Sequence, residues 1–305
     1  MKSILTLIRW KNLLMIALMQ LLIKYAFLEP YGAATSLDTL GIILLIISTV
    51  CIAAAGNVIN DINDVETDFI NKPNKIIIGK SISEKTAYNL FIILNVIGVG
   101  VGYYLSNLVG RSGFFSLFVI ISVLLYVYST YLKQQFLMGN LVISIMVALS
   151  IVIVGVFELI PNITEQNQTL QLLYFKTILN YAFMAFILNL IREIAKDVED
   201  IEGDTKAGMN TLPIIIGKEK TKYMLFGLSL MILFVIGFYV MDSLYKNQVA
   251  VIYFLIFIIA PLLYLNIKIF SAKTKLDYTH ISNILKLIML FGMLSLLLYK
   301  YNLTR

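Results

Sequence analysis

Several residue types are scarce in this chain of 305 residues. Its one cysteine, Cys51, lies in an apolar run, which excludes a disulfide within the chain and favours a small buried residue. Its one histidine, His280, excludes a metal site built from several histidines. Charged residues make up only 14% of the chain, whereas a soluble domain has about 25%. The scarcity of charge therefore argues against an ordinary soluble domain.

Apolar residues are abundant instead, at 59% of the chain with a mean hydropathy of +0.87. One globular core could not bury so many, so the composition predicts a protein of the lipid bilayer. No cleavable signal peptide is expected, because Lys2, Arg9 and Lys11 precede a long apolar segment without a small-residue cleavage site. We expect a single integral-membrane domain over residues 1–305.

Nine apolar segments are long enough to cross a bilayer as helices of about 20 residues. They are expected near residues 12–30, 39–60, 86–106, 114–132, 137–158, 172–195, 222–242, 248–270 and 282–301. The predicted fold is therefore all-α, a polytopic bundle of nine transmembrane helices. Three glycines in the third segment, Gly98, Gly100 and Gly102, indicate close helix packing there.

The basic residues are distributed unevenly between the two sides of this topology. The N-terminus and the even-numbered connections share one side, which has most of the 24 Lys and Arg residues. The positive-inside rule makes that side cytoplasmic. Topology and attraction to anionic headgroups account for the net charge of +6, so no nucleic-acid partner is expected.

An acidic segment occurs twice. Residues 60–68 read NDINDVETD and residues 196–204 read KDVEDIEGD, and each copy is followed by IIIGK. Three aspartates match at one constant separation: Asp61, Asp64 and Asp68 match Asp197, Asp200 and Asp204. Both copies follow even-numbered segments. The simplest interpretation is two related halves that present acidic clusters on the same face of the membrane.

The spacing within each copy has a geometric meaning. Residues four apart lie on one face of a helix, about 6 Å apart along its axis. If the second helix continues far enough, Asn60, Asp64 and Asp68 form one stripe. Asp200 and Asp204 form the matching stripe on the sixth helix. The two remaining aspartates, Asp61 and Asp197, flank these faces.

Facing stripes of carboxylates repel each other unless a cation lies between them. Oxygen ligands suit a hard ion, Mg2+ or Ca2+. Mg2+ usually takes one or two protein carboxylates and completes its shell with water and substrate phosphates. The pattern therefore predicts a Mg2+–diphosphate clamp, in preference to solvated loop charges, because the cluster repeats at matching helix ends. The basic candidates for the phosphate oxygens are Lys72, Lys75, Lys133, Arg192 and Lys196.

The motifs NDxxDxxxD and DxxDxxxD in a nine-span chain resemble the UbiA superfamily of intramembrane prenyltransferases. The resemblance covers nearly the whole chain. It extends to the start LIRWKN, to YSTYLK followed by Gly139 and Asn140, and to REIAKDVEDIEGD leading to TLP. Members of that family transfer a prenyl group from a polyprenyl diphosphate to an acceptor in the membrane.

The resemblance also implies roles for individual residues. The residues implied to hold Mg2+ and diphosphate are Asn60, Asp64, Asp68, Asp200 and Asp204, with Asp61 and Asp197 in support. Of these, Asp64, Asp68, Asp200 and Asp204 are implied to be the catalytic residues. The implied diphosphate-binding residues are Lys72, Lys75, Lys133, Arg192, Lys196, Arg9 and Asn12. Mg2+ and these cations would neutralise the departing diphosphate, and aromatic faces would stabilise an allylic cation. Many relatives have NRP after the first motif; here Asn74, Lys75 and Ile76 stand there, and lysine lacks the bidentate fork of arginine.

The acceptor is less sharply indicated. REIAKDVEDIEGD and NKPNK are most similar to the geranylgeranylglycerol-phosphate geranylgeranyltransferase branch, which implies an ether bond to geranylgeranylglyceryl phosphate. An aromatic acceptor of the quinone, haem or chlorophyll type is the alternative. A transporter is a remote one, because transporter sites lie near the membrane midplane. A CDP-alcohol phosphotransferase is disfavoured because its DGxxAR signature is missing. His280 and Lys286 are expected in a basic connection that faces headgroups.

Overall fold

The computed structural model describes residues 2–74 and 76–302. Within these residues the regular elements are helical, and the sole β-type pairing is an isolated bridge between Ile78 and Ile82. The elements are α1 (Lys2–Leu7), α2 (Trp10–Leu22), η1 (Ile23–Leu28), α3 (Thr39–Asn63), α4 (Val65–Asn71), α5 (Glu84–Leu108), η2 (Ser112–Phe114), α6 (Phe115–Thr130), η3 (Leu132–Gln134), α7 (Met138–Leu159), η4 (Ile160–Asn162), α8 (Gln168–Lys206), α9 (Leu212–Ile216), α10 (Lys218–Tyr239), η5 (Val240–Leu244), α11 (Gln248–Phe254), η6 (Leu255–Ile259), α12 (Ala260–Ser271), α13 (Lys275–Leu294) and α14 (Leu297–Asn302).

Nine helical stretches of the described chain are long and apolar enough to cross a membrane, which confirms the predicted number. They are Trp10–Leu28, Thr39–Asn63, Glu84–Leu108, Ser112–Thr130, Met138–Asn162, Gln168–Lys206, Lys218–Leu244, Gln248–Ser271 and Lys275–Tyr299. The protein is an all-α, multi-pass integral membrane protein.

The helices run long because the few residues that break or cap helices lie at their ends. The chain has five prolines, and Pro213 and Pro261 stand in the first turns of α9 and α12, where a missing N–H costs little. Asp38 and Ser83 accept hydrogen bonds from backbone N–H groups in the first turns of α3 and α5. Local sequence therefore sets where the long helices begin.

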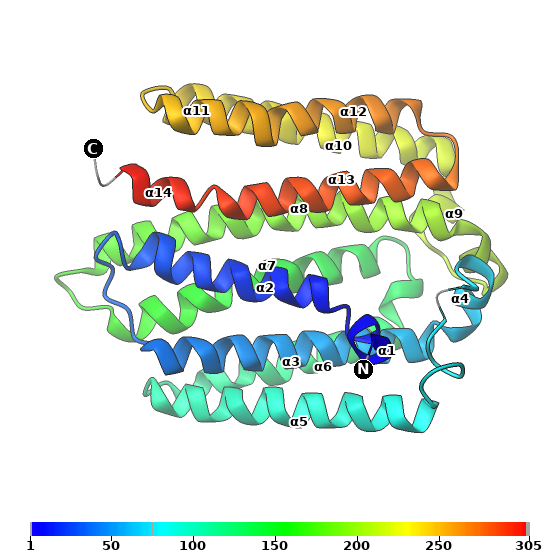
Figure 1. Cartoon of the computed structure of the whole chain (residues 1–305), viewed down its shortest axis with the longest axis horizontal. Coiled ribbons are helices and arrows are strands. Elements are labelled where there is room, and N and C mark those ends of the chain that lie inside the picture. The colour runs from blue at the N-terminus through cyan, green and yellow to red at the C-terminus, as the bar shows by residue number, and fades with distance from the viewer. Residues whose placement is uncertain (1, 75, 303–305) are drawn as a thin grey trace.

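The long helices lie side by side, and their connections gather at two opposite ends of the bundle (Figure 1). The short helices α4 and α9 are both at one end, which we call the acidic end because both acidic segments lead into it. In the middle of the bundle α7 packs on α8, α8 packs on α13, and α13 contacts α2, which in turn packs on α3 and α7. These contacts close a ring of helices around a central space.

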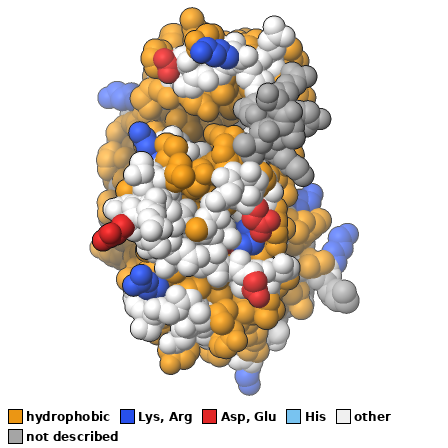
Figure 2. Space-filling view, turned by 90° about the vertical axis from the view of Figure 1, so that its left-hand side faces the viewer, with side chains coloured by type: hydrophobic (Ala, Val, Ile, Leu, Met, Phe, Trp, Pro, Cys, Tyr) orange, Lys and Arg blue, Asp and Glu red, His pale blue; other side chains and the backbone are white. Residues whose placement is uncertain are grey.

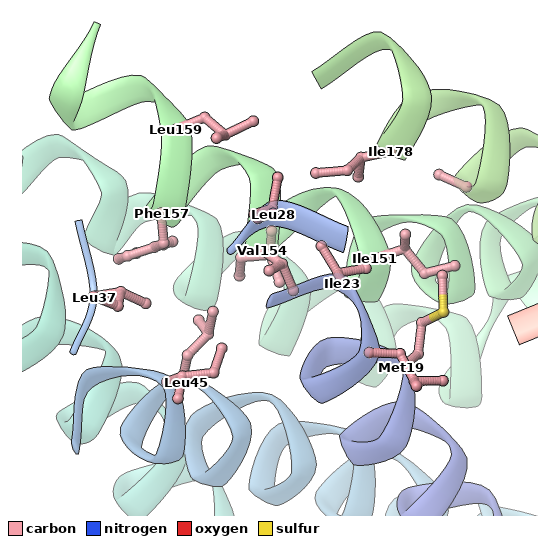
Figure 3. Packing of buried hydrophobic residues seen from close by; sticks show 14 of the residues in the cluster. Met19, Ile23, Leu28, Leu37, Leu45, Ile151, Val154, Phe157, Leu159 and Ile178 are labelled. Atoms are coloured by element: carbon pink, nitrogen blue, oxygen red, sulfur yellow. The ribbon is translucent and has the colours of Figure 1, made fainter. Parts of the chain in front are cut away.

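The opposite end is filled by apolar packing. Figure 3 shows Leu28, Leu45 and Phe157 among side chains that point toward one another there, and all three are fully buried. Seen from outside, this end has isolated acidic and basic side chains scattered among apolar ones (Figure 2). The two ends thus differ, because the repeated acidic segments lead into the acidic end only.

Two of the three glycines in α5 allow close packing. A Cβ atom on Gly98 would lie 2.6 Å from Ile52 Cγ1, and one on Gly102 would lie 2.4 Å from Phe118 Cδ2. Ser48 Oγ also donates a hydrogen bond of 2.6 Å to the Gly98 carbonyl. Gly100, in contrast, has no neighbour within 4 Å of such a Cβ. The expectation of close packing is confirmed for Gly98 and Gly102 and is wrong for Gly100.

Candidate active site

The second acidic segment lies on one continuous helix. α8 runs from Gln168 to Lys206, well past the predicted end near residue 195, because the chain meets no helix-ending residue before Gly208. Gly208 has φ +69°, the left-handed conformation with which many helices end. Asp197, Asp200 and Asp204 therefore occupy successive turns of α8, as the spacing predicts.

The first acidic segment is bent. α3 ends at Asn63, Asp64 has φ −95° and ψ 2°, and α4 starts at Val65. The hydrogen bonds Asp64 N to Asn60 O (3.0 Å) and Asp68 N to Asp64 O (2.8 Å) nevertheless continue through the bend. The stripe that Asn60, Asp64 and Asp68 were expected to form is thus interrupted at its middle residue.

A contact between the two halves accompanies the bend. α4 packs against α8, and the Asn71 side chain accepts a 2.9 Å hydrogen bond from Gly203 N. A Cβ atom at position 203 would lie 2.3 Å from Asn71 Nδ2, so only glycine admits this approach. The bend at Asp64 lets α4 lie over α8, which brings the two acidic segments together.

Lysines from other elements neutralise the two segments. Lys133, in η3, pairs with Asp64 Oδ1, and Lys72 Nζ lies 2.5 Å from Asp200 Oδ2. Lys275 Nζ lies 4.0 Å from Asp200 Oδ1 and donates a hydrogen bond to the Asn71 carbonyl. The central aspartate of each copy therefore has a lysine counter-ion supplied from elsewhere in the chain.

The two flanking aspartates have polar partners too. Arg9 Nη2 lies 2.8 Å from Asp61 Oδ1. Burial alone would lower the pKa of the Arg9 guanidinium, but Asp61 and the neighbouring carboxylates outweigh it and raise that pKa. Arg9 has φ +54°, an uncommon conformation for a residue with a Cβ, and it turns the chain between α1 and α2. Asn140 Nδ2 donates a 2.8 Å hydrogen bond to Asp197 Oδ2. Arg9 and Asn140 thus fix the orientation of Asp61 and Asp197.

The acidic residues of both segments and most of their partners line one cavity of about 780 Å³. Thirteen of the fourteen candidate residues from the sequence line it: Arg9, Asn12, Asn60, Asp61, Asp64, Asp68, Lys72, Lys133, Arg192, Lys196, Asp197, Asp200 and Asp204. Lys75 lies outside the described residues. The structure therefore brings together residues that the sequence separates by more than half of the chain.

The oxygen donors of the cavity suit a metal ion whose coordination shell is completed by phosphate oxygens. In the described part of the chain, no three Asp, Glu, His or Cys side chains converge into a closed ion cage. Two buried oxygens at the cavity wall, Asn60 Oδ1 and Asp200 Oδ1, accept no hydrogen bond. Burial and the charge of Asp64 raise the pKa of Asp68 to about 6. Such an open, electron-rich set fits Mg2+, which takes few protein carboxylates and fills its shell with water and phosphate oxygens.

Several cavity residues escaped the sequence analysis. The aromatic side chains in the described cavity wall are Trp10, Phe118 and Tyr128, which composition alone could not select. Lys286 lies on α13 and lines the cavity, so its expected place in a headgroup-facing connection is wrong. His280 also lies on α13, where its Nε2 is 3.0 Å from the Tyr264 hydroxyl. A lysine within the apolar run of α13 is the signal that identifies Lys286 in the sequence.

Comparison with known proteins identifies relatives of this site and fold. The model of the UbiA prenyltransferase family matches residues 21–299. A digeranylgeranylglyceryl phosphate synthase of Methanosphaera stadtmanae is 32% identical over 224 residues, which are 72% of this chain and 74% of that protein. A protein of the same name from Methanococcoides burtonii is 29% identical over 300 residues, 97% of this chain and 98% of the relative.

Solved structures share the fold. One, from work on digeranylgeranylglyceryl phosphate synthase in membranes, has a TM-score of 0.64 and 24% identity over 99% of this chain and 98% of its own. A UbiA homologue from Archaeoglobus fulgidus, bound to GPP and Mg2+, has a TM-score of 0.55 and 19% identity over 96% of this chain and 99% of its own. With paired acidic segments at one end of a nine-span bundle, and with a family model that covers almost its whole length, this chain belongs to the UbiA prenyltransferase family.

Proposed function

We propose that this enzyme transfers a geranylgeranyl group from its diphosphate to geranylgeranylglyceryl phosphate, and so forms the second ether bond of an archaeal-type lipid. The observation that carries the proposal is the single cavity in which both acidic segments meet their lysine partners. The choice of acceptor is supported by relatives named digeranylgeranylglyceryl phosphate synthase, one of which matches along 97% of this chain.

The residues that would hold Mg2+ are Asn60, Asp64, Asp68, Asp200 and Asp204, with Asp61 and Asp197 beside them. When bound, Mg2+ stabilises the negative charge that develops on the departing diphosphate. Lys72 and Lys133 already lie against Asp200 and Asp64, so they are placed to exchange these carboxylates for phosphate oxygens. Lys75 follows the same segment and is proposed for the same task.

The reaction then breaks one bond and forms another. The bond between C1 of the prenyl group and the diphosphate oxygen breaks, and the diphosphate leaves with the electron pair. The free hydroxyl oxygen of the acceptor bonds to C1, and its proton passes to an oxygen of the departing diphosphate. Tyr128 and the apolar wall contributed by Phe118 and Leu125 shield the allylic cation from water.

A transfer assay separates this acceptor from aromatic ones. Membranes containing the protein receive labelled geranylgeranyl diphosphate and Mg2+, with geranylgeranylglyceryl phosphate in one sample and 4-hydroxybenzoate or dihydroxynaphthoate in others. We expect a labelled ether lipid in the first sample alone, and its loss when EDTA removes Mg2+. A labelled aromatic product would support the prenyltransferase activity but would contradict the proposed acceptor.

We also propose that residues 1–305 form one domain whose acidic end faces the cytoplasm. The excess of Lys and Arg in the connections at that end supports the orientation. In a Cys51→Ala background, a thiol introduced by Ser112→Cys is expected to react with an impermeant maleimide in intact cells. One introduced by Ser81→Cys, at the acidic end, is expected to react only after the cells are opened. The reverse pattern of labelling would contradict this orientation and place the acidic end outside the cell.

A further inference from the structure

A second cavity of about 160 Å³ adjoins the main one. The two cavities share part of their lining, so they adjoin there, and we call this shared part the junction. Its polar side chains include Asn12, Asn189, Arg192 and Lys286, and Ile16, Val147 and Ser150 also line both cavities. The rest of the smaller cavity lies between α2, α7, α8 and α13. It therefore extends from the polar junction into the membrane-spanning part of the bundle.

Beyond the junction the lining is apolar and rich in methionine. Met15 and Met19 come from α2, Met184 from α8, and Met289 and Met293 from α13. Lys286, Met289 and Met293 stand at i, i+3 and i+7, so one face of α13 presents a cation at one end and thioethers along the rest. Methionine side chains are flexible and adapt to irregular apolar partners, such as a branched hydrocarbon chain. The smaller cavity is thus amphipathic along its length.

The junction has more cationic side chains than its carboxylate can neutralise. Arg192 Nη1 lies 2.6 Å from Glu193 Oε1, and Lys196 Nζ lies 2.8 Å from Glu193 Oε2. Lys286, on α13, is a third cation, and it lines the same cavity as Arg192, Glu193 and Lys196. No acidic side chain in residues 2–74 or 76–302 lies within 4.0 Å of its ammonium, and Arg192 Nε is buried without a hydrogen-bond partner. Charges within a membrane-spanning region are costly, so a lysine that faces a cavity without a carboxylate partner, beside an arginine with a free Nε, indicates an anionic ligand.

The cations of the junction lie apart from the lysines at the acidic segments. Arg192 precedes Asp200 by eight residues on the same helix, which places it about 12 Å deeper along the axis. Lys72 and Lys133, in contrast, lie directly against the acidic segments. The cavity therefore has two cationic positions: one at the acidic segments and one at the junction with the methionine-lined space.

We propose that Lys286 and Arg192 bind the phosphate of the acceptor lipid, and that the first part of its hydrocarbon chain enters the methionine-lined cavity; this inference rests on the proposed function. The acceptor has a phosphate, a free hydroxyl and one prenyl chain on a single glycerol. With the phosphate at the junction and the chain in the smaller cavity, the hydroxyl faces the main cavity, where C1 of the donor lies. Arg192, which the sequence groups with the donor diphosphate, is thereby reassigned to the acceptor.

Lys286→Met tests this assignment cleanly, because Lys286 has no carboxylate partner to strand and methionine matches the local lining. The full-length protein is placed in phosphatidylcholine nanodiscs, which carry no net anionic headgroup. We expect the KM for geranylgeranylglyceryl phosphate to rise about ten-fold or more, while the KM for geranylgeranyl diphosphate changes by less than about two-fold. Lys286→Arg is expected to restore most of the acceptor affinity. Lys85→Met, on the exposed face of α5, serves as the control.

A phosphate-free acceptor, geranylgeranylglycerol, separates phosphate binding from a change of cavity shape. The preference of the wild-type enzyme for the phosphorylated acceptor is expected to shrink about ten-fold in Lys286→Met, since the lost contact concerns the phosphate alone. An equal loss with both acceptors would overturn the proposal, as would a rise in the donor KM.

Direct binding distinguishes failure of this inference from failure of the proposed function. Geranylgeranylglyceryl phosphate is titrated into the nanodiscs without donor. Binding that Lys286→Met weakens supports the site even if an aromatic compound turns out to be the acceptor in the transfer assay. Binding that the substitution leaves unchanged overturns the site, even if the transfer assay confirms the ether lipid.

Discussion

Asp64→Asn and Asp200→Asn are each expected to lower the rate of prenyl transfer by about 10³-fold or more. Each substitution keeps the shape of the side chain and one oxygen but removes the negative charge. Asp64 and Asp200 are the central acids of the two segments, and each faces a lysine from another element. Loss of either charge is therefore expected to weaken the binding of Mg2+ and to release the lysine that we propose receives a phosphate oxygen.

The measurement is the initial rate of ether formation with labelled geranylgeranyl diphosphate over a range of Mg2+ concentrations. The chain offers a matched pair of controls. Glu66 and Glu202 occupy equivalent positions in the two acidic segments, and both are exposed and outside the cavity wall. Glu66→Gln and Glu202→Gln are expected to keep the rate within about two-fold. If the glutamate variants lose as much activity as the aspartate variants, general negative charge at this end, rather than the facing acids, would explain the motif.

Much of this site was predictable because its signals are local. Hydropathy gives the nine membrane-spanning helices, and the repeat of Asp64 at Asp200 gives the two acidic segments. The spacing of three and four residues then fixes which carboxylates share a face, and all of them line the cavity. The prediction is most accurate for α8, because in an uninterrupted helix the spacing of residues in the sequence determines which side chains share a face.

The features that could not be predicted depend on which helices become neighbours. The bend at Asp64 occurs where α4 lies over α8, and the contact there joins Asn71 to Gly203, two residues far apart in the sequence. The position of Lys286 beside Arg192 requires α13 to pack on α8. No local pattern encodes either contact, although a lysine inside an apolar helix signals that some partner is needed.

A buried ion pair at the end opposite the acidic end also joins segments that are far apart in the sequence. Lys24, in η1, has its Nζ 2.9 Å from Glu158 Oε1 and donates a 2.5 Å hydrogen bond to the Leu37 carbonyl. Glu158, in the last turns of α7, accepts a 3.2 Å hydrogen bond from Leu37 N. The Lys24 side chain is 2% exposed and that of Glu158 is 0% exposed. The pair thus joins α7, η1 and the segment before α3.

Glu158→Gln is expected to lower the free energy of unfolding by about 3–5 kcal/mol, because it leaves the Lys24 ammonium buried without its main counter-ion. Glu29 cannot replace it fully, since its carboxylate is 3.7 Å from Lys24 Nζ and its side chain is 46% exposed. Unfolding of the purified protein in detergent measures the loss, and one transition is expected if residues 1–305 form one domain.

Glu29→Gln is the control, with a loss below about 1 kcal/mol. Adding Lys24→Met to Glu158→Gln is expected to recover part of the stability, because the double variant leaves no unpaired buried charge. Equal losses in the single and double variants would show that the unpaired charge of Lys24 is not the cause of the lost stability.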